Sequence, residues 1–494
     1  MRVLHVVSEV YPLIKTGGLA DVAAALPAAQ ARLGAEARLL VPGYPEVMAL
    51  AETLAPIAAL PEAPGGAAAW LRFGEIEGLG VPAYVIDCPA LYAPSGHPYL
   101  DEAGIDRPEN PLRFGLLGRT GATLGAGLDA GWRPTAVHAH DWQAGLAPLH
   151  MALDRAAGIR AEDGGPPAAS VITIHNLAYQ GLFPAETRAL LGLPESVMSV
   201  EGAEFHGKFG FLKAGLYHAD RITTVSPTYA AEIRTPAEGC GLDGLLDTRA
   251  AEGRLVGILN GIDDTVWNPA ADAYLPAPYD AADPAPKARS KAALQRRLGL
   301  SERADTPLFG IVARANRAKG LDMLLNVLPG LVSRGGQLAL LLAGDRDLEQ
   351  GFREAMTAWP DRVAGQIGYD ESLSHLIQAG ADCVLVPSRS EPCGLTQMYA
   401  MRYGSPPLVR RTGGLADTVV NAEPAAVASG EATGFVFDDP TDAALAGTLA
   451  WAMDLHRDAD AWARIRQAGM IRDFGWTAPA RQYLALYAAA RADR

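Results

Sequence analysis

Cysteine and long hydrophobic runs are scarce in this chain, and their scarcity excludes whole classes of protein. The 494 residues include only four cysteines, which are widely spaced and form no CxxC pair. A disulfide framework is therefore not expected, and we predict a cytoplasmic protein. No run of about 18 apolar residues free of charges occurs, so no membrane span is predicted. The amino-terminal "MRVLHVVSEVYP" carries His5 and Glu9 within its apolar run, which indicates a first strand rather than a signal peptide.

Positive charge, and lysine in particular, is also in short supply. Lys and Arg together number 42 against 56 Asp and Glu, which gives a formal net charge of −14. That charge disfavours nucleic acid and anionic membranes as partners, although a local cluster of donors can still bind a small anion. Only six of the basic residues are lysines, and two of these, Lys15 and Lys319, stand beside glycine motifs.

Several common catalytic motifs are missing as well. The glycine-rich "GLLGRTGATLGAG" lacks the strand–GxGxxG–helix context of a dinucleotide site, and no acidic residue follows it at the expected spacing. Neither a GxxxxGK[ST] phosphate loop nor a GxSxG nucleophile elbow occurs. The sequence therefore does not favour a nicotinamide-dependent enzyme, a P-loop NTPase or an α/β hydrolase.

Short apolar runs alternate with helical patterns along most of the chain. This alternation predicts an α/β protein with parallel sheets covered by helices on both faces. Runs such as "CVLVP" are apolar throughout, as expected for strands buried on both sides. The predicted strands are 3–7, 37–41, 83–86, 136–138, 170–174, 221–225, 255–259, 309–313, 337–343, 364–367, 383–387 and 407–409.

The length is too great for one core, and two breaks divide the chain. One is "LNGIDDTVWNP" at 259–269, which an irregular Ala/Pro/Asp-rich stretch follows. The other precedes a final helix, and "AEDGGPPAAS" at 161–170 is predicted to be a surface loop. We predict two doubly wound, Rossmann-like domains and a terminal helix, at 1–258, 259–475 and 476–494.

One internal repeat is present: Thr-Gly-Gly-Leu-Ala-Asp occurs at 16–21 and again at 412–417. Each copy lies between a predicted strand and an apolar helical pattern. Paired glycines let a ligand approach the backbone, and the free N–H groups of a helix start attract an anion. Ligands of doubly wound sheets bind beyond the carboxyl ends of the strands. We therefore predict that the two domains face a central cleft, where both turns contact one diphosphate.

Charged side chains at other strand ends are further candidates. Glu391 follows a buried strand and precedes a helix with a polar start, where a carboxylate can bind sugar hydroxyls or stabilise positive charge on a reacting carbon. Arg314 ends a strand and Lys319 follows five residues later, which suits a diphosphate leaving group.

The "VHAHDW" stretch places His138 and His140 on one face of an extended strand, which is metal-ligand spacing. No further cluster supplies the missing ligands, so no metal is predicted. Asp141 and Trp142 at the strand end favour a sugar contact. "TIHN" offers His175 and Asn176 at another strand end, where a pocket role is favoured.

Nine motifs run in order over nearly the whole chain: "KTGGLADV", "HAHDW", "TIHNLAYQG", "FLKAGLYHADRITTVSPTYAAEI", "GLDGLL", "GILNGIDDTVWNP", "QIGY", "SRSEPCGLTQMYAMRYGSPPLVRRTGGLADTV" and "GFVF". Together they resemble the bacterial glycogen synthases and plant starch synthases. The resemblance implies the two-Rossmann-domain glycosyltransferase B fold, with a final helix that returns to the first domain. It implies glucose transfer from ADP-glucose to the non-reducing end of an α-1,4-glucan such as glycogen, with retention at the anomeric carbon and no metal or other cofactor.

The resemblance also implies roles for single residues. Tyr369 is expected near adenine, and Tyr92 and Trp142 are expected to contact glucan. Two departures, "ARANRAKG" where the family often has "SRL…QKG" and Ser390 where Phe is frequent, remove no charged group. The expected catalytic residues are Glu391, His175, Arg314, Lys319 and Asp21. The expected donor contacts are Lys15, Gly17, Gly18, Asp141, Asn176, Asn260, Arg314, Lys319, Tyr369, Cys393, Gly394, Leu395, Thr396, Thr412, Gly413 and Gly414.

No residue stands out as a covalent nucleophile, so retention is expected to proceed on one face of the sugar. The leaving diphosphate would take the proton of the incoming hydroxyl. Two alternatives stay open on the residues alone: a transferase of the same fold with another donor such as UDP-glucose, and a non-catalytic glucan-binding protein. The oligomeric state is not predicted.

Overall fold

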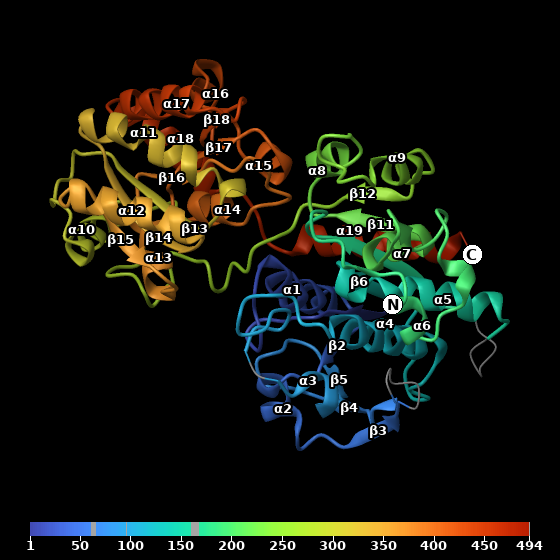
Figure 1. The fold of residues 1–494 in the computed structure, drawn as a ribbon. Coiled ribbons are helices and arrows are strands. Elements are labelled where there is room, and N and C mark those ends of the chain that lie inside the picture. The colour runs from blue at the N-terminus through green and yellow to red at the C-terminus, as the bar shows by residue number, and fades with distance from the viewer. Residues whose placement is uncertain (61–65, 95, 160–166, 494) are drawn as a thin grey trace. The chain divides into compact units, whose positions relative to one another are not determined.

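The computed structural model describes residues 1–60, 66–94, 96–159 and 167–493 (Figure 1). The chain divides into two compact units. The N-terminal unit comprises Met1–Gly261 together with Trp476–Arg494, and the C-terminal unit comprises Ile262–Gly475. Most of the predicted surface loop at 161–170 lies outside the described residues.

The N-terminal unit is built on a nine-stranded sheet in the order β12-β11-β7-β6-β1-β2-β5-β4-β3. Its pairs are parallel except where β4 joins β3 and β5. Its strands are β1 (Arg2–Val6), β2 (Glu36–Pro42), β3 (Pro56–Ala59), β4 (Trp70–Gly74), β5 (Ala83–Asp87), β6 (Ala136–His140), β7 (Ala169–Ile174), β11 (Arg221–Thr224) and β12 (Leu255–Gly257). A separate antiparallel sheet contains β8 (Leu182–Pro184), β9 (Glu204–Phe205) and β10 (Lys208–Gly210).

The terminal helix α19 (Thr477–Ala492) completes the core of the N-terminal unit, and in Figure 1 its red ribbon lies among the green and blue elements of that unit. Tyr483, Leu486, Tyr487 and Ala490 recur at the spacing of one helix face and are buried. They share a core cluster with Val22 and Leu26 of α1, and with residues of β1, β6 and β7. The other helices of this unit are α1 (Gly18–Arg32), α2 (Pro45–Ala51), α3 (Pro89–Tyr92), α4 (Asn110–Ala126), α5 (Leu146–Ala156), α6 (Thr187–Leu190), α7 (Phe211–His218), α8 (Pro227–Glu232) and α9 (Asp243–Ala251).

The C-terminal unit has a six-stranded parallel sheet in the order β15-β14-β13-β16-β17-β18. Leu321, Leu324 and Leu328 of α11 are buried on one helix face and belong to the main core cluster of this unit. Its strands are β13 (Leu308–Ala315), β14 (Gln337–Gly344), β15 (Val363–Ile367), β16 (Cys383–Val386), β17 (Pro407–Arg410) and β18 (Phe435–Phe437). Its helices are α10 (Lys287–Leu298), α11 (Leu321–Ser333), α12 (Arg346–Ala358), α13 (Glu371–Gly380), α14 (Thr396–Arg402), α15 (Gly413–Thr418), α16 (Pro424–Ser429), α17 (Asp442–Leu455) and α18 (Ala459–Met470).

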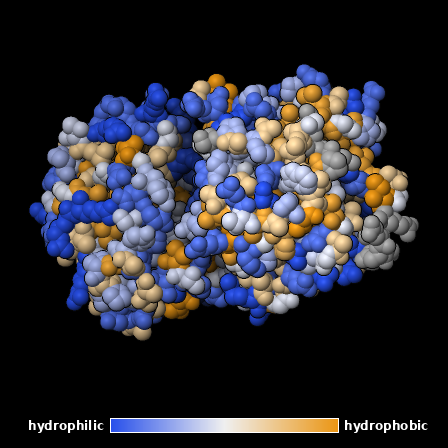
Figure 2. All heavy atoms as spheres, turned by 90° about the horizontal axis from the view of Figure 1, so that it is seen from below, coloured by the Kyte–Doolittle hydropathy of each residue, from blue (hydrophilic) through white to orange (hydrophobic). Residues whose placement is uncertain are grey.

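Surface hydropathy shows no broad apolar face in the view drawn. In Figure 2, hydrophobic residues are scattered among hydrophilic ones. None of the described helices combines the length and the apolar character needed to cross a bilayer.

Candidate active site

The first Thr-Gly-Gly turn is open at its glycines. A Cβ built on Gly17 or Gly18 would meet no atom within 4 Å, so the backbone here is accessible to a ligand. Lys15 beside it is exposed, and its Nζ lies 2.8 Å from Oδ1 of Asp21 on the first turn of α1. The turn therefore presents accessible backbone next to a paired ammonium group.

Glu9, which the sequence did not single out as a site residue, holds this turn in place. Its carboxylate accepts hydrogen bonds from the backbone N–H and, at 3.0 Å, from the hydroxyl of Thr16. Burial raises the pKa of Glu9, and the bonds from Thr16 and Gly17 oppose that rise. A carboxylate inside an otherwise apolar run was the available signal, since a buried acid needs partners.

Asp141 ties the ends of β6 and β7 together. Its Oδ1 accepts a hydrogen bond of 2.7 Å from the backbone N–H of His175, and Asn176 also donates its backbone N–H. Burial raises the pKa of Asp141 from 3.8 to about 7, against the effect of these two bonds. The backbone of Asp141 has φ 55°, in the left-handed region that a non-glycine residue rarely adopts. The carboxylate thus orients the His175–Asn176 backbone, and Oδ1 of Asn176 accepts from the N–H of Ala178 at 3.0 Å.

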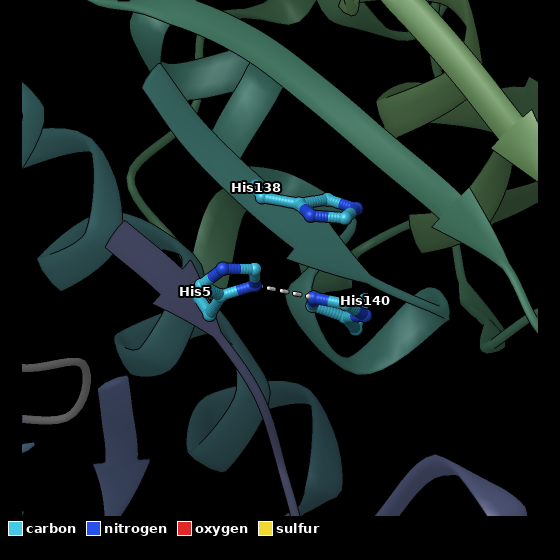
Figure 3. A group of neighbouring side chains, drawn as sticks. All are labelled: His5, His138 and His140. Carbon is cyan, nitrogen blue, oxygen red and sulfur yellow. Dashed lines mark hydrogen bonds between the residues drawn. The ribbon is translucent and has the colours of Figure 1, made fainter. Parts of the chain in front are cut away.

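Buried histidines lie beneath this strand end. Figure 3 shows His5 from β1 beside His138 and His140 from β6, with Nδ1 of His5 3.1 Å from Nε2 of His140. Nδ1 of His140 lies 3.0 Å from Nε2 of His175, so the row continues to the end of β7. One nitrogen from each of His5, His138 and His140 lies within 4.8 Å of the others. The sequence predicted that His138 and His140 share one face of a strand. It did not predict that His5 lies beside them, because that contact depends on β1 being the neighbour of β6 in the sheet.

Two aromatic residues, Tyr92 and Trp142, were expected to contact glucan, and the structure places them in different surroundings. Tyr92 is fully buried, and its hydroxyl donates to the carbonyl of Arg113. That placement does not fit a glucan contact, and we correct the expectation: Tyr92 is a core residue of the N-terminal unit. Trp142 lies nearly buried among aromatic rings that include Phe114 and Phe183.

Asn260 is a buried polar residue at the end of the N-terminal unit. Its side chain is 6% exposed, and Oδ1 has no hydrogen-bond partner within the described parts of the chain. A buried acceptor without a partner is costly to the fold, so it favours a binding role.

In the C-terminal unit, Lys319 and Glu391 form a close ion pair. Nζ of Lys319 lies 2.5 Å from Oε2 of Glu391, which also accepts from the hydroxyl of Ser388 at 3.0 Å. Lys319 follows β13, and Glu391 follows β16, which is the neighbouring strand of the sheet. Glu391 is 8% exposed, whereas the side chain of Lys319 is 30% exposed, so the carboxylate is buried and the ammonium is still reached by solvent. Arg314 is exposed near the end of β13.

The second Thr-Gly-Gly turn differs from the first because its glycines are packed. A Cβ on Gly413 would lie 2.0 Å from the carbonyl oxygen of Glu391, and one on Gly414 would lie 2.2 Å from that of Cys393. The φ of Gly413 is 42°. Glycine is therefore required here so that the turn can pack against the 391–393 backbone. Thr412, Gly413 and Gly414 are all buried.

The remaining predicted donor residues lie around this packed turn or apart from it. Cys393 is buried, and Gly394, Leu395 and Thr396 lead into α14 and are partly exposed. Tyr369 is separate from them at the end of β15, 78% exposed, with its hydroxyl donating to Glu371.

Two family models match the chain. The model described as the starch synthase catalytic domain covers residues 2–248, and the model described as glycosyl transferases group 1 covers residues 297–468. The catalytic domain of starch synthase IV from Arabidopsis thaliana, solved with ADP and acarbose, has a TM-score of 0.87 with 31% identity over 99% of both chains. The two Rossmann-like units therefore define a glycosyltransferase of the B fold, as the sequence predicted.

Full-length relatives identify the family. A glycogen synthase of Rhodopseudomonas palustris is 50% identical over 99% of this chain and 98% of its own length. A glycogen synthase of Serratia proteamaculans is 49% identical over 99% of each chain. This chain belongs to the family of glycogen and starch synthases.

Proposed function

We propose that this glycosyltransferase transfers glucose from ADP-glucose to the non-reducing end of an α-1,4-glucan, with retention at the anomeric carbon and release of ADP. The ion pair of Lys319 and Glu391 at the carboxyl ends of adjacent strands carries the proposal. Relatives named glycogen synthase along the whole chain, and a solved starch synthase with ADP bound, support the choice of donor.

In the C-terminal unit, Lys319 and Arg314 neutralise the diphosphate as the bond to glucose breaks. Glu391 orients the glucosyl group and holds the ammonium of Lys319 in position before the donor arrives, because the two groups are already paired. Thr412, Gly413, Gly414 and the 393–396 segment supply further donor contacts, and Tyr369 contacts adenine.

In the N-terminal unit, Lys15 and the open backbone of Gly17 and Gly18 contact the donor, with Asp21 held against Lys15. His175, Asn176 and Asn260 face the sugar, and Asp141 fixes the backbone of the first two. The departing diphosphate accepts the proton of the attacking glucan hydroxyl, so no protein nucleophile is required. Trp142 remains the candidate for a glucan contact in this unit.

Donor choice is tested by the release of nucleoside diphosphate. The enzyme is incubated separately with ADP-glucose and UDP-glucose, each with and without glycogen and with a metal chelator present. We expect glycogen-dependent release of ADP that the chelator does not reduce. Faster turnover of UDP-glucose would reject the assigned donor, and glycogen binding without release from either donor would indicate a binding protein.

The ion pair is tested by substitution. Lys319→Ala and Glu391→Ala should each lower kcat by about 10²–10³-fold, because the charge on the leaving diphosphate or the orientation of the sugar is lost. Arg317→Ala removes an exposed cation two residues from Lys319 and serves as the matched control. Near-normal kcat in a folded Lys319→Ala variant would contradict the assignment.

A further inference from the structure

A buried glutamine connects two rows of aromatic side chains in the N-terminal unit. Gln30 of α1 donates from Nε2 to the hydroxyl of Tyr487 of α19 at 3.1 Å. Its Oε1 lies 2.8 Å from Nε2 of His5. Gln30 and His5 are fully buried and Tyr487 is nearly so, so water does not compete for these bonds.

The chemistry of an amide fixes the direction of each bond. The carbonyl oxygen of Gln30 can only accept, so His5 must carry its proton on Nε2. His5 is neutral, since burial lowers its pKa to about 4 and the bond from Gln30 does not offset this. A neutral imidazole with a proton on Nε2 has a lone pair on Nδ1, and His5 therefore accepts at that atom.

The same logic passes from ring to ring toward the strand ends. Nδ1 of His5 accepts from Nε2 of His140 at 3.1 Å, so His140 is also protonated on Nε2. Nδ1 of His140 then accepts from Nε2 of His175 at 3.0 Å. Burial, reinforced for His140 by its histidine neighbours, lowers the pKa values of both rings, and that of His175 falls to about 3. His175 is thus left with a lone pair on Nδ1.

The hydrogen bonds on the Nε2 side of Gln30 can be given one consistent direction as well. The hydroxyl of Tyr487 accepts from Gln30, which leaves its own proton for Nδ1 of His138, 2.7 Å away. His138 then donates from Nε2 to the hydroxyl of Thr173 at 2.6 Å. Both branches are therefore consistent with one orientation of the Gln30 amide, in which Nε2 faces Tyr487 and Oε1 faces His5.

A metal ion is the competing interpretation of the three clustered histidines. Every ring nitrogen of His5, His138 and His140 is already within hydrogen-bond distance of Gln30, Thr173, Tyr487 or another histidine. A metal ligand would have to give up one of these bonds at a site that is fully buried. The hydrogen-bonded arrangement is therefore favoured over a metal centre.

We propose that Gln30 and Tyr487 are positioning residues that set the tautomer of His175 through His5 and His140. Residues of the first and last helices of the chain thereby hold an unprotonated Nδ1 at the end of β7, where it can accept a hydrogen bond from a sugar hydroxyl. The sugar contact rests on the proposed function, whereas the tautomer itself is a property of the protein without substrate.

Nuclear magnetic resonance of the full-length enzyme with 15N-labelled histidine tests the tautomer directly. Near neutral pH and without substrate, we expect His175 to be protonated on Nε2 and not on Nδ1. Gln30→Met should remove this preference, raise KM for the sugar donor and lower kcat/KM by about tenfold or more. A merely unfolded fraction lowers kcat but does not raise KM.

Conservative and matched variants separate positioning from packing. Gln30→Glu should retain the tautomer and most of the activity, because its carbonyl oxygen still accepts from Nε2 of His5. We call the hydrogen-bonded row of Tyr487, Gln30, His5, His140 and His175 the relay. Tyr487→Phe should weaken the preference of His175 for a proton on Nε2. Tyr483→Phe, one turn away on α19 and outside the relay, should leave that preference unchanged. If the tautomer responds as expected but ADP-glucose is not a substrate, only the proposed function fails.

Three results would overturn the relay. The first is a proton on Nδ1 of His175 in the unmodified enzyme. The second is a Gln30→Met variant with an unchanged tautomer. The third is stoichiometric binding of added zinc with loss of the N–H signals of His5, His138 and His140.

Discussion

The buried carboxyl group of Asp141 makes the stability of the fold depend on pH. Its pKa is raised from 3.8 to about 7 by burial, although the backbone N–H groups of His175 and Asn176 oppose the rise. The folded state therefore binds this proton more tightly than the unfolded state does. The resulting contribution to stability is full below pH 4 and is lost as the pH rises through 7.

Asp141→Asn should remove this pH dependence. At pH 8 the variant should have a free energy of unfolding higher than the parent by about 1–3 kcal/mol, and the difference should vanish toward pH 4. Activity should fall about tenfold, because an amide oxygen holds the His175 backbone less strongly than a carboxylate. Denaturant unfolding across this pH range, with the exposed Asp106→Asn as control, measures the effect. A variant less stable than the parent at every pH would show that the ionised carboxylate stabilises the fold.

Residue types at strand ends could be predicted, but their partners could not. Glu391 and Lys319 were predicted separately, and the bond between them joins positions 72 residues apart. Gln30 and Tyr487 gave no signal, since a single glutamine in an alanine-rich helix is normally a surface residue. Their role follows from the contact between α1 and α19, which lie at opposite ends of the chain.

At the scale of elements, one hexapeptide forms two different turns. The Gly17 copy begins a helix with open space around its glycines, and the Gly413 copy packs against the carbonyl of Glu391. Sequence alone cannot distinguish them, because the difference comes from the neighbouring 391–393 segment. This comparison supplies a matched pair of substitutions.

Gly413→Ala should destabilise the C-terminal unit by more than about 2 kcal/mol, because the new methyl group collides with backbone at a positive φ. Gly17→Ala should change stability by less than about 0.5 kcal/mol, because nothing lies within 4 Å. It should still raise KM for ADP-glucose if the donor approaches this backbone. Urea unfolding and initial rates measure both effects. Unchanged kinetics for Gly17→Ala would show that the donor does not approach the backbone of the first turn.

Buried parallel strands were the elements best predicted from sequence. The predicted 337–343 corresponds to β14 (Gln337–Gly344), and the predicted 309–313 to β13 (Leu308–Ala315). The antiparallel β3 and β4, and the small sheet of β8, β9 and β10, were not predicted. Most of these strands are short or partly exposed and lack a continuous apolar run, so the pattern that identifies buried strands is absent.

At the scale of the whole molecule, the N-terminal unit is assembled from two distant pieces of the chain. Trp476, Tyr483 and Tyr487 belong to its core cluster, although more than 200 residues of the C-terminal unit separate them from Gly261. The C-terminal unit, by contrast, is continuous from Ile262 to Gly475. The two units should therefore respond differently to removal of the last helix.

A chain that ends at Gly475 should retain a folded C-terminal unit and lose cooperative unfolding of the N-terminal unit. Removing α19 exposes the apolar faces of α1, β6 and β7 that Tyr483 and Tyr487 cover, and it leaves Gln30 without a partner for its Nε2. Calorimetry of the truncated chain should show the transition of the isolated 262–475 fragment and no second one. Adding the 476–494 peptide should restore the missing transition, because α19 contributes packing and hydrogen bonds rather than a covalent constraint. If the truncated chain kept both transitions, α19 would be dispensable for folding, and the hydrogen-bond relay through Tyr487 could then be removed without structural cost.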